Sequence, residues 1–413
     1  QLVSGTGLSI NTWEHVVITS SASKEYKMYI NGVLKDTQTL SGTVSVNTNG
    51  ARFGEYSLAG GYNFSGQIDQ ARFFNTELTQ SQVTTLARGI ATSYSGTNTG
   101  VNFNGQLNFA PDFVWVKNRD ESSYHYLYNT VSQGNLYSDS TATQDANSVA
   151  SYGTISPSSN GFGVTRGSNS SSNGLNKNSN DYVSWSWKAG GAAVSNNNGT
   201  IASQVSANKD SGFSIVKYTG NNTDGATVGT GLTQACNIVI VKDLTSANYW
   251  CVGGSTVGDG ENLYLNDQGA KLTRDRVKSV QTNTFTLGNH SETNSTNNFI
   301  AYCWHSVTGY SKIGTFVGTG TTTGNVVTVG FEPRFLLVKS TTYAGTNWII
   351  LDKARTPNNP MENDLNPNLA NAEQTGTGNN YPQATTTSTT FQCNTTDSSI
   401  NGSGHTYLYV AIA

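Results

Sequence analysis

The stretch Phe331-Glu332-Pro333-Arg334-Phe335-Leu336-Leu337-Val338-Lys339 shows how the whole chain is organised. A turn containing proline leads into four apolar residues that end on a lysine. A short apolar run of this kind, bounded by polar residues, is typical of a buried β-strand. The same phrase occurs at 109–117 as Phe-Ala-Pro-Asp-Phe-Val-Trp-Val-Lys, and a more divergent copy occurs at 236–242 as Cys-Asn-Ile-Val-Ile-Val-Lys. The stretch is therefore one copy of a threefold internal repeat, and such a repeat decides the fold.

Four further landmarks surround each copy in the same order: an aromatic residue two positions before a glycine, an aromatic segment after the lysine, a strand that opens with Phe, and a closing aromatic strand. They lie at 94–96, 124–128, 162–164 and 182–187, at 218–220, 249–252, 285–287 and 299–304, and at 316–318, 348–351, 391–393 and 407–412. The pattern predicts three related β-sandwich modules at 91–191, 209–308 and 310–413, with a polar linker at 190–208. Lys117, Lys242 and Lys339 should then occupy one equivalent strand position.

The tryptophans of the repeats are expected to be mostly buried, because they lie on or beside the predicted strands. They are Trp115, Trp185, Trp250, Trp304 and Trp348.

The composition favours an all-β chain, and the succession of repeats predicts an elongated, multidomain arrangement. Charged residues make up 12% of the sequence, about half the usual share of a globular protein. Aromatic residues make up 10%, which is enough to build cores and argues against disorder. The net charge of -3 provides no basic surface, so nucleic acid is not expected as a partner. No apolar run reaches the length of a membrane span.

The ends of the sequence have the character of a chain that was cut. No signal peptide is visible, but the chain opens on Gln1 and closes inside a predicted strand at Ala413. A targeting segment could therefore have been lost.

The four cysteines, Cys236, Cys251, Cys303 and Cys393, are too few for a disulfide framework in a chain of this length. We expect them to be buried as small apolar residues. A disulfide between Cys236 and Cys251, on adjacent strands, remains an alternative. No Cys-x-x-Cys spacing indicates a metal site.

Residues 1–88 differ from the repeats. Strands are expected at 13–19, 26–30, 33–36, 51–54 and 64–74, with a two-residue hairpin turn at 31–32 and a short helix at 81–88. This part resembles the laminin-G-like members of the concanavalin-A-like lectin and glucanase superfamily. The matching residues are Trp13, His15, Val16, Tyr29, Asn31, Gly32, Phe64, Gly66, Ile68, Asp69 and Arg72. The resemblance implies the C-terminal half of a jelly roll that binds glycans or proteins. It implies no catalysis, because the paired glutamates of the superfamily's hydrolases have no counterpart.

The repeats resemble modules of tail-fibre and other virion-surface proteins of marine bacteriophages, especially cyanophages. The residues that carry this resemblance are the Phe-x-Pro-x-Phe strand with its Val-Lys ending and the passage Trp-His-Ser-Val-Thr-Gly-Tyr-Ser-Lys-Ile-Gly-Thr-Phe at 304–316. The resemblance implies a place on the virion surface and contacts with other virion proteins. It also implies a homo-oligomer, with a trimer as the first expectation.

Catalytic and metal-binding patterns are weak. The five histidines, His15, His125, His290, His305 and His405, lie singly on separate elements. The densest acids are Asp120 with Glu121, Asp259 with Glu261, and Glu362 with Asp364. All are expected in solvated loops, although the passages 259–262 and 361–366 leave a calcium site open. The densest charge, at Lys271, Arg274, Asp275, Arg276 and Lys278, favours a solvated loop face.

Exposed aromatic rings among Asn, Asp and Gln side chains are the usual elements of a sugar site. Tyr56, Tyr62, Tyr343 and Tyr381 lie in loops of this composition and are the glycan-binding candidates.

Together these patterns predict a structural and adhesive virion-surface protein that binds host glycans and is not an enzyme. Two alternatives stay open: a glycan depolymerase or hydrolase of a phage tailspike, and a secreted bacterial adhesin or surface protein.

Overall fold

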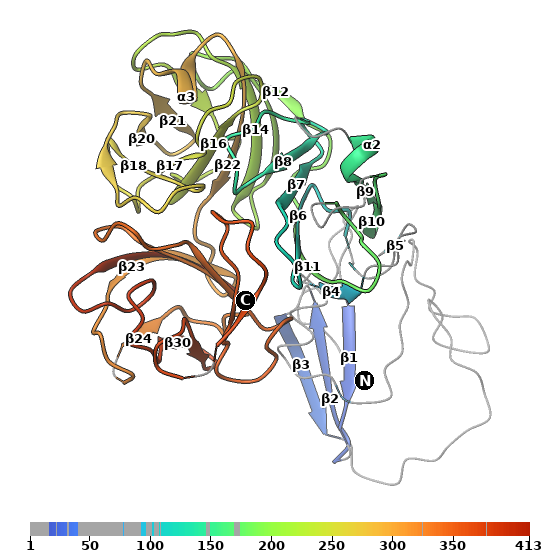
Figure 1. Cartoon of the computed structure of the whole chain (residues 1–413). Helices are drawn as coiled ribbons and strands as arrows, with labels where there is room; N and C mark the ends of the chain where they lie inside the picture. Colours follow the sequence, from blue (N-terminus) through green and yellow to red (C-terminus); the bar gives the residue numbers. More distant parts are fainter. Residues whose placement is uncertain are drawn as a thin grey trace, which may run out of the picture. The chain divides into compact units, whose positions relative to one another are not determined.

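The computed structural model describes residues 16–21, 23–30, 33–39, 77, 92–95, 101–102, 107, 109–145, 149–168, 174–323, 325–376 and 378–413, with the backbone alone at 92–95 and 101–102 (Figure 1). Within these residues the regular structure is almost entirely β-strand, apart from the four-residue helices α2 (Val149–Tyr152) and α3 (Ser291–Asn294). The predicted all-β fold is confirmed. The chain divides into two compact units, Gln1–Gly89 and Ile90–Ala413.

The first unit contains an antiparallel sheet of β1 (Val16–Ser20), β2 (Glu25–Ile30) and β3 (Val33–Thr39), in that order. Ile30 pairs with Val33, so two residues join β2 to β3, which is the predicted hairpin length. The strands expected at 51–54 and 64–74, the helix at 81–88, and Tyr56 and Tyr62 lie outside the described residues.

In the second unit, one strand order occurs three times. We call the predicted segments 91–191, 209–308 and 310–413 modules 1, 2 and 3; their boundaries remain predictions. In each module the first strand pairs with the last, the last with the lysine strand, and the lysine strand with the aromatic strand. These strands are β4 (Thr92–Ser95), β11 (Asp181–Trp187), β6 (Phe113–Asn118) and β7 (His125–Asn129) in module 1; β14 (Phe213–Thr219), β22 (Asn298–Trp304), β16 (Ile238–Asp243) and β17 (Cys251–Gly253) in module 2; and β23 (Ser311–Val317), β31 (Thr406–Ile412), β25 (Phe335–Ser340) and β26 (Ile349–Asp352) in module 3.

The register of these strands repeats as well as their order. Lys117 pairs with Val183, Lys242 with Ile300 and Lys339 with Leu408. The closing strands end at Trp187, Trp304 and Ile412, and in each of them the partner of the lysine lies four residues before that end. The three lysines therefore hold one equivalent position, as the repeat predicted.

A second sheet covers the outer face of each inner sheet. These outer sheets are β5 (Val101–Asn102), β10 (Gly161–Thr165) and β9 (Thr154–Ser158); β15 (Thr227–Gly229), β21 (Thr284–Leu287) and β20 (Val277–Val280); and β24 (Val326–Thr328), β30 (Thr390–Cys393) and β29 (Ala384–Thr386). An apolar cluster fills the space between the two sheets of each module. The inner sheets are thus buried on both faces, which is why their lysine strands read as continuous apolar runs.

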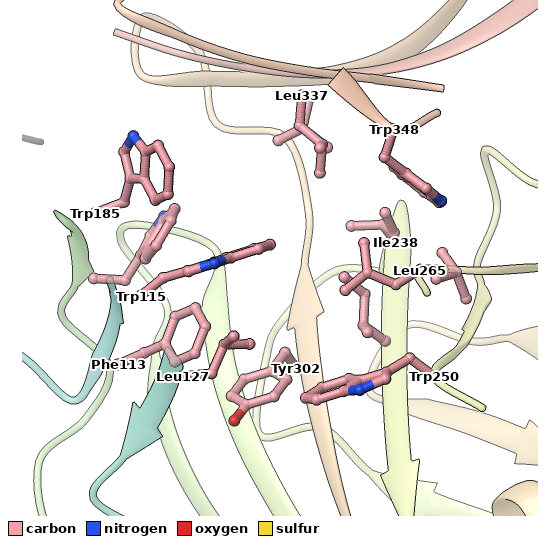
Figure 2. Close-up of a cluster of buried hydrophobic side chains, with 14 of the residues drawn as sticks. Phe113, Trp115, Leu127, Trp185, Ile238, Trp250, Leu265, Tyr302, Leu337 and Trp348 are labelled. Carbon is pink, nitrogen blue, oxygen red and sulfur yellow. The ribbon is translucent and has the colours of Figure 1, made fainter. Parts of the chain in front are cut away.

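The other face of all three inner sheets lines one shared core (Figure 2). Phe113 and Trp115 of module 1, Ile238 of module 2 and Leu337 of module 3 belong to the same cluster. The modules are therefore arranged around a common core, whereas the repeat pattern had been interpreted as an elongated row. The sequence shows that alternate residues face opposite sides of a sheet, but it does not show which side meets a neighbouring module.

The prediction of a polar linker at 190–208 needs correction. Nearly half of this segment forms β12 (Val194–Asn196) and β13 (Ser203–Asn208), which add to the edge of β14 and enlarge the inner sheet of module 2. Val205 is only 3% exposed and packs in the core of this module. One buried valine among polar residues was too weak a periodic signal to predict a strand.

The modules join at three junctions, which we call the 1–2, 2–3 and 3–1 seams. One equivalent backbone hydrogen bond crosses each seam, from a loop of the earlier module to the carbonyl two residues after the lysine of the next. These bonds run from Gln144 to Leu244 (3.1 Å), from Lys271 to Thr341 (2.9 Å) and from Glu373 to Arg119 (2.7 Å). Because the last one links module 3 back to module 1, the three modules close into a ring.

Four of the five tryptophans predicted to be buried are at most 5% exposed: Trp115, Trp185, Trp250 and Trp348. Trp304 is only partly buried and packs against the edge of the shared core. It ends its strand, and its ring stacks on Phe213 with the ring centres 4.7 Å apart.

Candidate functional site

The three equivalent lysines are fully buried and act within the fold. The Lys242 ammonium donates to the carbonyl of Thr141 across the 1–2 seam at 3.0 Å, and the Lys339 ammonium donates to the carbonyl of Gln268 across the 2–3 seam at 3.3 Å. Burial lowers the pKa of Lys117 to about 7 and those of Lys242 and Lys339 to about 8. Because none of them reaches solvent, these cations satisfy backbone carbonyls and present no charge to a ligand.

The 1–2 and 2–3 seams also share an indole hydrogen bond. Trp250 donates through Nε1 to the carbonyl of Tyr137, and Trp348 donates through Nε1 to the carbonyl of Tyr264, both at 2.9 Å. The register of β7 places His125 at the equivalent position of module 1.

At the 3–1 seam, His125 is fully buried. Its Nδ1 accepts a hydrogen bond from Trp115 Nε1 at 3.0 Å, so the imidazole proton is on Nε2. This Nε2 is buried near the backbone of Asn366 in module 3 but forms no hydrogen bond of normal geometry among the described residues. Burial and the Lys117 charge hold the pKa of His125 well below 6.5. The imidazole is therefore neutral and takes the place of the indole.

Charge is concentrated at the 3–1 seam. Glu373 binds Arg119 through two hydrogen bonds of 2.8 and 2.9 Å and Arg355 through one of 2.9 Å. Arg355 is also bonded to Asp352 at 2.6 Å. Burial raises the pKa of Glu373, but the hydrogen bonds and charges of the two arginines outweigh it and hold the pKa below 4.5. This network is structural, since the Arg355 and Asp352 side chains have no exposed surface.

The predicted acid pairs do not gather into one cleft. Glu261 pairs with Lys271 at 2.5 Å and Glu121 pairs with Lys177 at 2.6 Å, while Asp259 is exposed. Asp364 is buried rather than solvated, and burial raises its pKa to about 7. Within the described ranges, no group of three or more His, Cys, Asp or Glu side chains could hold a metal ion.

The cysteines are buried and free, as expected for small apolar residues. The alternative Cys236–Cys251 disulfide is wrong. Cys251 pairs in register with Val241, five residues beyond Cys236, and the thiol of Cys236 instead lies against that of Cys303.

Of the glycan-binding candidates, Tyr343 and Tyr381 fall in the described residues and each is 45% exposed. Tyr343 stacks on His405, with ring centres 4.4 Å apart and planes at 21°. Tyr381 lies directly over Gly376, where a Cβ atom would collide with its ring. Both rings thus have a fixed backing and an accessible surface.

The surroundings of Tyr343 are neutral and polar. The turn is held by a hydrogen bond from the Tyr343 backbone to Ser340 Oγ, and Thr342 Oγ1 accepts a bond from the backbone of Thr406. The loop of module 2 that crosses the 2–3 seam places the exposed amide of Gln268 beside the same turn, bonded to Asn347. An aromatic face bordered by hydroxyl and amide groups is suited to a neutral sugar.

A third exposed ring, Tyr249, is not among the candidates that the sequence predicts. Tyr249 is 43% exposed and stacks on Tyr264 at 4.7 Å. The repeat pattern includes it in an aromatic segment, but β17 begins only at Cys251, so Tyr249 lies in the preceding loop. The pattern of apolar residues could not show that the strand starts two residues later.

The fold defines a class: an all-β protein in which three β-sandwich modules close into a ring around a shared core. The chain belongs to the family described as a domain of unknown function (DUF7483), whose model matches residues 90–413. Residues 1–84 match the concanavalin A-like lectin/glucanases superfamily, which confirms the resemblance seen in this part of the sequence. Comparison with curated proteins and with solved structures gives no match. In the described residues no helix is long and apolar enough to cross a membrane.

Proposed function

We propose that this chain is a structural and adhesive protein of a virion surface, a fibre or appendage that binds neutral glycans of the host and performs no catalysis. The observation that carries the proposal is the Tyr343–His405 stack, an exposed ring on a rigid backing among neutral hydrogen-bonding groups. The virion assignment rests on the resemblance of the repeats to phage fibre modules.

The low charge of the chain supports a role outside a cell. Only 12% of the residues are charged, so few surface interactions weaken when ionic strength rises. The lectin-type match of residues 1–84 agrees with a binding role, although the superfamily also includes glucanases.

The test is binding of the full chain to a panel of neutral polysaccharides, measured by calorimetry. Tyr343→Ala should weaken binding by about tenfold or more, equivalent to about 1.4 kcal/mol. Val317→Ala is the matched control, since Val317 is also exposed on module 3 but has no aromatic ring. Equal affinities for Tyr343→Ala and the wild type would overturn this site.

Three measurements test the rest of the proposal. Antibodies against the chain should label intact particles; labelling of bacterial cells alone would favour the adhesin alternative. New reducing ends released from a polysaccharide, and lost in Glu261→Gln or Glu362→Gln, would favour the depolymerase. Mass measurement in solution should give a homo-oligomer, with three chains as the first expectation.

A further inference from the structure

The Tyr249 platform of module 2 differs from the Tyr343 platform in its charge. The Tyr264 ring beneath Tyr249 carries the guanidinium of Arg274, whose Cζ lies 4.8 Å from the ring centre. Arg274 also donates to the Tyr264 hydroxyl at 3.3 Å. Tyr264, itself only 7% exposed, therefore packs against both the exposed ring of Tyr249 and a cation.

The Tyr264 ring is itself held in place. Its hydroxyl donates to Glu292 at 2.7 Å, and Glu292 in turn accepts a 2.7 Å bond from Arg276. Glu292 is only 8% exposed, so this network forms a fixed base under the platform. Neither Tyr249 nor Arg274 needs to be ordered by a ligand, which lowers the entropic cost of binding.

In the described part of the chain, Arg274 lacks an acid partner, whereas the cations around it are paired. Ion pairs join Arg276 to Glu292, Lys271 to Glu261 and Lys278 to Asp224. Among the described residues no carboxylate pairs with Arg274, and the neighbouring Asp275 carboxylate is directed toward Gly260. The pKa of His290 is lowered by burial and then by Arg276 and Arg274, against the single opposing charge of Glu292. The guanidinium of Arg274 thus has donors left for an anion.

We propose that the Tyr249–Arg274 platform binds an anionic sugar, with the apolar face of the sugar on Tyr249 and its carboxylate or sulfate on Arg274. The inference rests on the proposed glycan-binding function and adds a second site with a different ligand class. A planar guanidinium with free N–H groups is suited to bidentate binding of such an anion. Tyr249 and Arg274 lie 4.7 and 4.8 Å from the centre of the same ring, so a short oligosaccharide that extends across the edge of Tyr264 would reach both.

The experiment uses the full chain with three probes: polygalacturonate oligomers, dextran sulfate and neutral dextran. Arg274→Gln and Tyr249→Ala should each weaken the binding of an anionic probe by about tenfold or more, and binding should fall as salt is raised. The two anionic probes distinguish carboxylate from sulfate. Lys278→Gln is the matched control, since it removes a cation of the same segment that already has an acid partner.

Absence of binding to both anionic probes, or an equal loss in Lys278→Gln, would overturn the inference. Tyr249→Ala removes an exposed ring, so it keeps the test valid if Arg274→Gln disturbs the stack; near-ultraviolet circular dichroism checks that stack. The Tyr343→Ala variant separates the two proposals. If it loses neutral glycans while Arg274→Gln binds every probe normally, the proposed function stands and the anionic site fails.

Discussion

The 2–3 seam and the 3–1 seam occupy equivalent places in the ring but are filled by different kinds of side chain. At the 2–3 seam the Trp348 indole fills the space and donates to one carbonyl. At the 3–1 seam His125 stands in its place, and buried charges are linked by Glu373. The backbone hydrogen bond that crosses each seam is the same. The comparison shows that the backbone frame defines the seam and tolerates either an apolar or an ionic filling.

The largest effect is expected from breaking the apolar filling. Trp348→Ala should lower the free energy of unfolding by about 3–5 kcal/mol, because it leaves a cavity in the shared core and an unpaired carbonyl at Tyr264. Chemical unfolding followed by circular dichroism measures this loss. A loss below about 1 kcal/mol would mean that the neighbouring modules close the cavity.

Removing the buried charge of Glu373 at the 3–1 seam should lower the free energy of unfolding by nearly as much. Glu373→Gln keeps the shape but removes the charge between Arg119 and Arg355, and breaking a buried pair in this way costs about 3 kcal/mol. Because the pKa of Glu373 is held below 4.5, its contribution is present above that pH and is lost as pH falls through the lower folded value. The variant should therefore approach the wild type in acid. A difference that stays constant from pH 7 to pH 3 would contradict this role.

His125 should make the 3–1 seam sensitive to pH in a milder range. Because its pKa in the folded chain lies well below 6.5, the unfolded chain binds more protons as pH falls below 6.5, and stability is lost. This contribution reaches at most about 1.4 kcal/mol per pH unit. His125→Gln keeps an acceptor for Trp115 but cannot titrate, so the stability difference between wild type and variant should shrink from pH 6.5 to pH 5.

Other buried groups also titrate in this pH range, so the stability of the wild type alone would not report on His125. Burial raises the pKa values of Asp139 and Asp364 to about 7, so both stabilise the fold as pH falls from 7 toward 3.8. Their contributions are present in the wild type and in His125→Gln and cancel in the difference. An unchanged difference would mean that His125 titrates normally.

The smallest effect is expected for surface charge at the 2–3 seam. Lys271→Ala removes an ion pair with Glu261 but leaves the backbone bond to Thr341. Both side chains are about one third exposed, so the loss should stay below about 1 kcal/mol and decrease with salt. A larger loss would show that charge also holds this seam.

The sequence predicts the repeat, the strands and the equivalence of the three lysines, because short-range apolar patterns encode them. It does not predict the ring, since a position that lies at each seam is not the same residue in the three copies: His125 in module 1 corresponds to Trp250 and Trp348. Nor does it predict buried lysines, because lysine is rarely fully buried and the carbonyls that satisfy Lys242 and Lys339 come from another module.

The candidate site was partly predictable. Tyr343 and Tyr381 are exposed where loop composition placed them. The stacking partners could not be foreseen, because His405 is 62 positions from Tyr343 in the sequence. Tyr249 was missed since its exposure depends on where β17 begins.

A ring made within one chain also changes how it can evolve. In a ring of three identical subunits every substitution appears three times, so a change that suits one seam must be tolerated at all of them. Here each position is inherited separately. His125 can therefore stand at a single seam where the other two have a tryptophan, and the exposed rings Tyr343 and Tyr249 can each belong to one module alone, while the backbone hydrogen bonds that hold the ring together are kept at all three seams.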